Sequence, residues 1–233
     1  MKNFKFNFNN IFGIMKYTFI SLRIPYIIEA VVFGLAFLPN LFISKISHGV
    51  DLIPAISIAL IINFISHLVV LARQLSKEEG RLLSLTPVTG GELLLGNFLE
   101  LLSVDLIITI IPFLWSYILS GKTPSLLISI IIPEMYGLIL GYLVLAPIIA
   151  IASSYIASTG LRVLAVILGS VIGNSIYDFI SNGILNLLPY FYFSFNGIYS
   201  GEIDIFAFIF GLIIIIGLYI FAAHNINKKL DIL

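Results

Sequence analysis

Cysteine is absent from this chain of 233 residues, and charge is scarce, because Asp, Glu, Lys and Arg together make up only 10% of it. Without cysteine the chain has no disulfide, no thiolate metal ligand and no catalytic thiol. Soluble domains are about a quarter charged. The low charge, together with 60% hydrophobic residues and a mean hydropathy of +1.12, therefore excludes an ordinary soluble domain and predicts a membrane protein.

Net charge is also absent, since twelve Lys and Arg balance twelve Asp and Glu. No overall field attracts nucleic acid, and we expect no nucleic-acid partner. The three histidines, His48, His67 and His224, are widely separated. No two of them stand with a carboxylate at the spacing of a metal site, so no metal is expected.

Apolar runs of about twenty residues, the length that crosses a hydrocarbon core of roughly 30 Å, can be placed six times. The approximate spans are residues 25–44, 52–72, 93–119, 125–151, 161–180 and 204–223. A spanning backbone must pair its own N–H and C=O groups, and these runs are continuous rather than alternating. The sequence therefore predicts an all-α membrane protein, with residues 1–233 forming a single domain of six transmembrane helices.

Lys and Arg give the orientation. If the N-terminus is cytoplasmic, ten of the twelve basic residues fall on the cytoplasmic side and only Lys45 and Lys122 fall outside. The cytoplasmic set is Lys2, Lys5, Lys16, Arg23, Arg73, Lys77, Arg81, Arg162, Lys228 and Lys229. This bias predicts a multi-pass cell-membrane protein with both termini in the cytoplasm.

Two segments lie outside the spans but are rich in aromatic residues. Residues 1–23 mix Phe with Lys and Asn, which is typical of a helix lying in the membrane interface; a signal peptide is the alternative, but no cleavage site follows. Residues 181–202 are apolar and broken by Pro189 and three glycines. We expect two short re-entrant helices there, with Pro189, Phe191 and Phe193 forming an outer gate; the alternative is an aromatic loop anchored at the headgroups.

Ionisable residues inside the spans are costly and face the bundle interior or water. Glu29 and Asp178 lie near span ends and are expected at the interface, and Glu100 lies in the third span. Asp105 and Glu134 sit deeper and are the candidates for a substrate path. The alternative for both is a satisfied hydrogen bond between helices.

Two possible enzyme signals are incomplete. The tripeptide GKT at 121–123 resembles the end of a phosphate-binding loop, but the required first glycine is Ser116. The Glu-Glu pair at 78–79 resembles an intramembrane protease motif, but Arg81 follows it two residues later rather than four. We expect neither nucleotide binding nor catalysis by this chain.

One polar segment stands out between the second and third spans, at residues 73–92, whose core reads KEEGRLLSLTPVTGGE. The second helix leaves the membrane at about Arg73, and a charged turn follows. The helical pattern stops at Thr86-Pro87, two glycines permit a turn, and Glu92 then suits the positive end of the next helix dipole. The segment is predicted to be a stiff cytoplasmic connection, which we call the coupling segment.

The coupling segment resembles the connection between the second and third spans in ABC-2 type transporter permeases, which has a Glu, a Gly, a Thr-Pro-Val turn and a Leu-Leu-Gly start to the third span. The matching residues are Glu79, Gly80, Leu83, Thr86, Pro87, Val88, Glu92, Leu94, Leu95 and Gly96. The predicted layout of spans is also similar. Asn97 departs from the family, where a lysine commonly follows the glycine.

The resemblance implies a non-enzymatic transport subunit that moves a hydrophobic or amphipathic substrate outward. It implies that the chain lies in the lipid bilayer and has two protein partners. These are a second permease chain, the same or similar, and separate ABC ATPase subunits. ATP and Mg would bind those ATPases, and this chain would hold no cofactor. The residues expected to bind the ATPase are Lys77, Glu78, Glu79, Gly80, Arg81, Thr86 and Pro87.

Two other functions remain open. A haem-export permease of cytochrome c maturation has a similar length, number of spans and connection between the second and third spans. A membrane-embedded enzyme or a scaffold would not transport anything. Copurification of an ATPase separates the transport subunit from the enzyme or scaffold.

Overall fold

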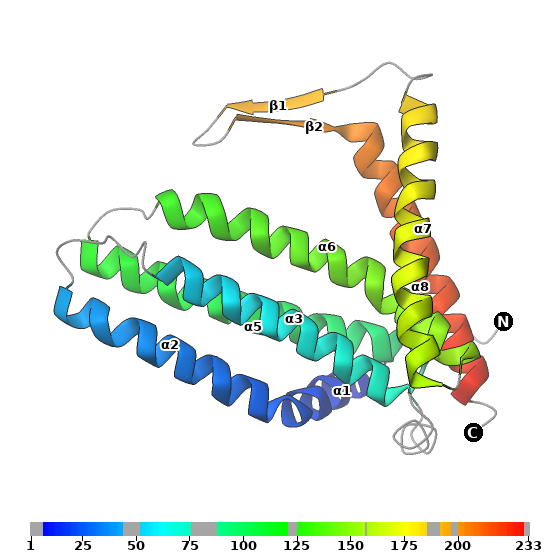
Figure 1. The fold of residues 1–233 in the computed structure, drawn as a ribbon, viewed down its shortest axis with the longest axis horizontal. Helices are drawn as coiled ribbons and strands as arrows, with labels where there is room; N and C mark the ends of the chain where they lie inside the picture. Colours follow the sequence, from blue (N-terminus) through cyan, green and yellow to red (C-terminus); the bar gives the residue numbers. More distant parts are fainter. Residues whose placement is uncertain are drawn as a thin grey trace. The chain divides into compact units, whose positions relative to one another are not determined.

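The computed structural model describes residues 7–43, 52–75, 88–120, 125–156, 158–185, 192–196 and 200–230. Over these residues the chain is helical apart from one pair of short strands (Figure 1). The elements, in order, are α1 (Phe8–Ser21), α2 (Arg23–Ile43), α3 (Ile53–Gln74), α5 (Gly90–Ser120), α6 (Ser125–Tyr155), α7 (Thr159–Leu185), β1 (Tyr192–Asn196), β2 (Ser200–Asp204) and α8 (Ile205–Leu230).

Within the described ranges, four helical stretches are long and apolar enough to cross a membrane: Ile53–Gln74, Gly90–Trp115, Ile130–Ser153 and Ile209–Lys228. The number rises to five if α1 and the first part of α2 form one bent span. The prediction of a multi-pass membrane protein is confirmed. The predicted span at 161–180 falls in α7, whose apolar stretch over the described residues, Gly160–Gly173, is shorter than a span.

The N-terminal segment is helical, as predicted, and a bend of 63° separates α1 from α2. The Asn7 side chain caps the start of α1 by accepting a hydrogen bond from the Asn9 N–H at 3.0 Å. Leu22 ends α1, and Pro25 falls in the first turn of α2. A proline is tolerated there because first-turn N–H groups need no helical acceptor.

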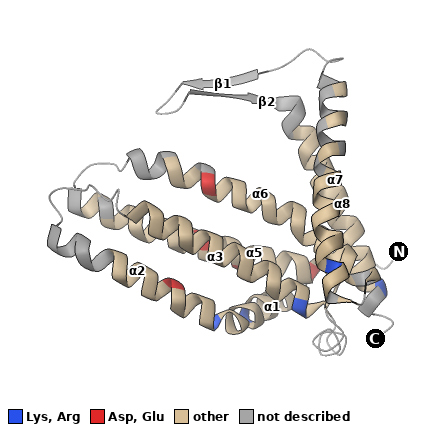
Figure 2. Ribbon diagram, viewed as in Figure 1, with Lys and Arg blue, Asp and Glu red and all other residues tan. Residues whose placement is uncertain are grey.

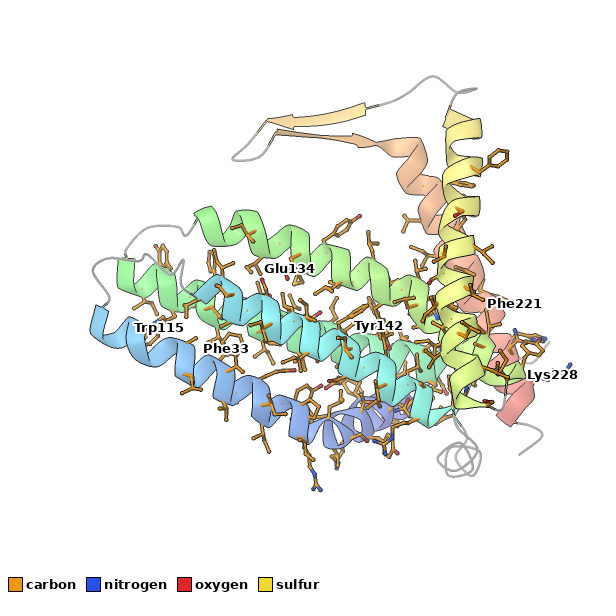
Figure 3. The ribbon with its side chains drawn as sticks, viewed as in Figure 1. Phe33, Trp115, Glu134, Tyr142, Phe221 and Lys228 are labelled. Atoms are coloured by element: carbon orange, nitrogen blue, oxygen red, sulfur yellow. The ribbon has the colours of Figure 1, made fainter. Side chains whose placement is uncertain are left out.

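The chain divides into two compact units. Unit 1 comprises Met1–Arg73 and Leu95–Tyr142. Its apolar core is a cluster of buried residues from α3, α5 and α6 and from the residue before α3: Leu52, Ile56, Ala59, Leu60, Ile108 and Ile131. Phe33 of α2 and Trp115 of α5 pack against this cluster (Figure 3). Unit 1 thus has its own hydrophobic core.

Unit 2 comprises Gln74–Leu94 and Leu143–Leu233. Its buried residues include Ala222, Ala223 and Ile226 near the C-terminal end of α8. Along the same helix Ile213 and Ile220 are 62% and 60% exposed. Large aliphatic side chains exposed on a long apolar helix suit contact with lipid rather than water.

Residues 181–202, which we call the outer segment, contain strand residues where helices were predicted. Strands β1 and β2 pair antiparallel, with Tyr192 opposite Asp204 and Asn196 opposite Ser200. The expectation of two re-entrant helices across 181–202 is therefore wrong over these residues, and the first five residues of the segment continue α7. The sequence YFSFN alternates aromatic and polar residues, a strand pattern, and Asn-Gly at 196–197 is a strong hairpin signal.

Candidate functional site

Unit 1 contains polar side chains that are buried or half-buried among apolar helices, and we call them the inner polar cluster. Its members are Tyr26 and Glu29 of α2, Asn63 and His67 of α3, and Glu100 and Asp105 of α5. Figure 2 shows acidic residues part-way along helices such as α2 and α6 rather than only at their ends. By sequence, no Lys or Arg occurs in residues 24–44, 46–72 or 82–121.

Helical spacing places these residues on shared faces. Asn63 and His67 are four residues apart on α3, and Tyr26 and Glu29 are three apart on α2. Side chains at these spacings lie on the same face of a helix. Each helix therefore directs a pair of polar groups into the interior of unit 1.

His67 and Glu100 form the centre of the cluster. The imidazole is fully buried, and its Nε2 is hydrogen-bonded to one oxygen of the Glu100 carboxyl group. The Tyr26 hydroxyl donates to the other oxygen at 2.5 Å. The imidazole Nδ1 lies 2.8 Å from the Asn63 carbonyl oxygen. A carbonyl only accepts, so Nδ1 is the donor and a further proton lies between Nε2 and Glu100.

Asp105, one of the two predicted path residues, is 1% exposed and accepts a hydrogen bond from the Asn63 amide at 2.7 Å. It therefore joins the same cluster through Asn63. The structure places its carboxyl group in the interior of unit 1, away from lipid. Two short contacts thus connect α5 to α3, one through Glu100 and one through Asp105.

Glu134, the other predicted path residue, lies on α6 apart from these contacts (Figure 3). It is half-buried and accepts a hydrogen bond from the Ser57 hydroxyl at 2.5 Å. Tyr142, further along α6, is fully buried, with its ring edge-on to His67 at a centroid distance of 6.5 Å. The aromatic ring shields the imidazole, whereas Glu134 makes a separate contact.

A second contact in unit 1 joins α1 to α5. The Thr18 hydroxyl donates to the Asn97 side-chain oxygen at 3.0 Å, and both residues are fully buried. At the neighbouring Gly96 an added Cβ would lie 2.8 Å from Ile14 Cβ. The absence of a side chain at Gly96 lets α1 approach α5, and a neutral amide at Asn97 suits burial where a lysine would bring a charge.

The coupling segment is described only at its two ends, residues 73–75 and 88–92. Lys77, Glu78, Glu79, Gly80, Arg81, Thr86 and Pro87 lie outside the described residues. At the start of α5, the Thr89 N–H donates to Glu92 Oε2 at 2.8 Å and the Glu92 N–H donates to Thr89 Oγ1 at 3.2 Å. This reciprocal capping box places Glu92 in the first turn of α5, as its suitability for the helix dipole predicted, but the helix begins at Gly90, two residues before the predicted start.

The same helix start is attached to α8 within unit 2. The Gly90 N–H donates to Asn227 Oδ1 at 2.6 Å. An added Cβ at Gly90 would lie 2.6 Å from the Ala223 carbonyl oxygen and 2.7 Å from Ile226 Cβ. Only glycine fits this approach, so the end of the coupling segment and the C-terminal part of α8 form one packed junction.

The predicted outer gate is only partly described. Pro189 and Phe191 lie outside the described residues, and Phe193 lies in β1 opposite Ile203. Among the described residues no group of three or more His, Cys, Asp and Glu could hold a metal ion.

Sequence reasoning missed the partners that complete the inner polar cluster, namely Tyr26, Asn63 and His67. A signal was present, since Asn63 and His67 are polar, four residues apart and inside an apolar run.

Comparison with protein-family models, curated proteins and solved structures gives no match to this chain.

Proposed function

We propose that this chain is the permease subunit of an ATP-driven ABC-2 type exporter. The observation that carries the proposal is the coupling segment, with its charged turn, its Thr-Pro-Val sequence and its Leu-Leu-Gly start to a long apolar helix. Two ATPase subunits would bind ATP and Mg and contact this segment, and a second permease chain would complete the path. Both termini would be cytoplasmic, and six spans would carry the substrate path.

The junction between α5 and α8 supports such a role. Displacement of the coupling segment can move the membrane-spanning helices only if the segment is attached to them. The capping box makes Thr89 and Glu92 part of the start of α5, and Gly90 bonds to Asn227 of α8. A force on the segment would therefore reach two helices that are long enough to span the membrane.

Tight packing at Gly96 supports the same role in unit 1. The motif glycine lets α1 approach α5, and the hydrogen bond between Thr18 and Asn97 holds the two helices together. Movement of α5 would then carry α1 with it. Two described residues of the motif, Glu92 in the first turn of α5 and Gly96 at the contact with α1, thus lie where a displacement would be passed on.

Copurification tests the proposal. The tagged chain is purified from membranes of its native host in nanodiscs, and Mg-dependent ATP hydrolysis is measured. We expect an ATPase to copurify with the unaltered chain and to be lost from Glu79→Lys, which reverses a charge in the coupling segment. Glu202→Lys is the matched control, since it makes the same change in β2, on the opposite predicted side.

Retention of the ATPase by Glu79→Lys, with loss in the control, would refute the role of the coupling segment. If no ATPase accompanies any of the three chains when each is folded, the scaffold or enzyme alternatives replace the exporter. Haem bound by the purified complex would favour the haem-export alternative. Each outcome therefore selects one of the functions named above.

A further inference from the structure

A cavity of about 400 Å³ in unit 1 lies between α1, α2 and α5. Its lining includes Phe19, Tyr26, Glu29, Phe33, Ile108 and Pro112, and its other lining side chains are aliphatic. Ligand pockets for small molecules have volumes of roughly 300–1,000 Å³ and apolar walls with a few polar groups. The cavity therefore has the size and surface of a small-molecule site.

Glu29 is the group in this wall that requires an explanation. It is 4% exposed, and its Oε1 is buried without a hydrogen-bond partner in the structure. Leaving a buried acceptor unsatisfied costs about 1–3 kcal/mol, and more when the group is charged. Tyr26, three residues earlier, cannot help, because its hydroxyl donates to Glu100. The carboxyl group of Glu29 remains available to a ligand.

The backbone adds a second acceptor. Pro112 lies inside α5 and has no N–H, so the carbonyl of Ile108, four residues earlier, lacks its helical donor. Both residues line the cavity. A carboxylate and a carbonyl only accept hydrogen bonds, so these groups favour a donor or a cation over an anion.

Charge balance favours a cation. Glu29 belongs to the inner polar cluster together with the carboxyl groups of Glu100 and Asp105. His67 is the basic residue in contact with Glu100, and it is already engaged there. The helices that line the cavity have two basic residues, the exposed Lys16 of α1 and Arg23 of α2, and neither lines the cavity. Arg23 precedes Glu29 by about 9 Å along the helix. A bound cation would offset the excess of carboxyl groups.

The aromatic rings restrict the ligand further. Phe19 and Tyr26 stand with their ring centroids 5.3 Å apart, and Phe33 lies on the same helix as Tyr26. Aromatic faces attract cations, by up to about 2 kcal/mol when the pair is desolvated, and also bind apolar groups. Phe19 is 56% exposed, as is Ile107, so the cavity opens on the apolar surface of unit 1, where a hydrophobic molecule can enter.

We propose that this cavity binds a hydrophobic organic cation, with the charged centre at Glu29 and the apolar body among Phe19, Phe33 and the aliphatic wall. Binding of such a cation by the cavity does not depend on any ATPase. The inference that such cations are the substrates of the exporter rests on the proposed function.

The test uses two probes of the same shape and opposite charge, tetraphenylphosphonium and tetraphenylborate. Each is titrated by equilibrium dialysis into the purified full chain in nanodiscs, with empty nanodiscs measured in parallel. We expect saturable binding of tetraphenylphosphonium and no saturable binding of tetraphenylborate. Equal saturable binding of both probes, or of neither, would overturn the proposal without any variant.

Three variants locate the site. Glu29→Gln keeps the shape and removes the charge, and we expect it to weaken tetraphenylphosphonium binding at least about tenfold. Val104→Phe fills the cavity without changing its charge and should also weaken binding. Glu202→Gln removes a carboxyl group from β2, which contributes no residue to the lining of the cavity, and should leave binding unchanged.

Unchanged binding in a folded Glu29→Gln chain would refute the site. An equal loss in Glu29→Gln and Glu202→Gln would also refute it, because it would indicate a general charge effect. Since the measurement uses no nucleotide, a missing ATPase leaves the result intact, and failure of cation binding leaves the ATPase experiment intact. The two proposals therefore fail separately.

Discussion

At the scale of single residues, the pair of His67 and Glu100 combines complete burial with several hydrogen bonds. Glu100 accepts from the Tyr26 hydroxyl as well as contacting the imidazole, and His67 Nδ1 is satisfied by the Asn63 carbonyl. In an apolar interior each polar group of such a network that loses its partner is costly. Removal of one member leaves the others without partners in an apolar interior.

We expect the effects of His67→Leu and Glu100→Leu to be strongly coupled. Each single change leaves a buried partner unpaired and should lower the free energy of unfolding by about 3 kcal/mol or more. The double change removes both groups and should cost clearly less than the sum. Unfolding of the four chains in mixed micelles measures the cycle, and additive effects would show that the contact contributes little.

The residues of this site were predictable only in part. Asp105 was identified because a carboxylate within an apolar run is conspicuous, and the structure buries it. The partnership of His67 with Glu100 was not predictable, since 33 residues separate them and only the packing of α3 against α5 brings them together. Helical periodicity assigns residues to faces but does not say which faces meet.

At the scale of elements, the long helices follow from the sequence because an apolar run of bilayer length must form a helix. The bend between α1 and α2 and the hairpin of β1 and β2 did not follow. The outer segment was interpreted from its apolar content and its proline, whereas its alternation and its Asn-Gly pair indicated strands. Short segments allow both interpretations, and strand pairing decides between them.

The close approach of α1 to α5 gives a prediction for Gly96→Ala. The new Cβ would meet Ile14 at 2.8 Å and the Ile11 carbonyl oxygen at 3.2 Å, so the helices must separate. We expect a loss of about 1–3 kcal/mol in the free energy of unfolding. Gly137→Ala is the control, because nothing lies within 4 Å of its added Cβ. The control should be neutral or slightly stabilising, since alanine favours a helix.

Thermal unfolding of both variants in the same detergent measures the difference. Equal stability of Gly96→Ala and Gly137→Ala would contradict the packing of α1 against α5. A loss confined to Gly96→Ala would explain physically why a glycine stands at the third position of the Leu-Leu-Gly sequence.

At the scale of the whole molecule, acidic and basic residues occupy different parts of the chain. Carboxyl groups such as Glu29, Asp105 and Glu134 occur within helices, whereas Lys and Arg are absent from long stretches of the apolar runs. Lysine and arginine outside the spans set orientation, and the buried carboxyl groups contribute little to it. The basic residues thus predict the topology, and the acidic residues provide the groups of the proposed internal site.

The topology can be measured directly because the chain has no cysteine. Single cysteines at Lys77 and Lys122 should react with a membrane-impermeant maleimide from opposite sides of the membrane, since the ten-to-two distribution of basic residues places the first inside and the second outside. Lys228→Cys should label with the first and Lys45→Cys with the second. Labelling of Lys77→Cys and Lys122→Cys from the same side would require an even number of crossings between them. Helix α5, which is long and apolar enough to span, lies between these two positions. Same-side labelling would therefore mean that α5 does not cross the membrane as a single span. The coupling segment would then lose the predicted cytoplasmic placement on which contact with an ATPase depends.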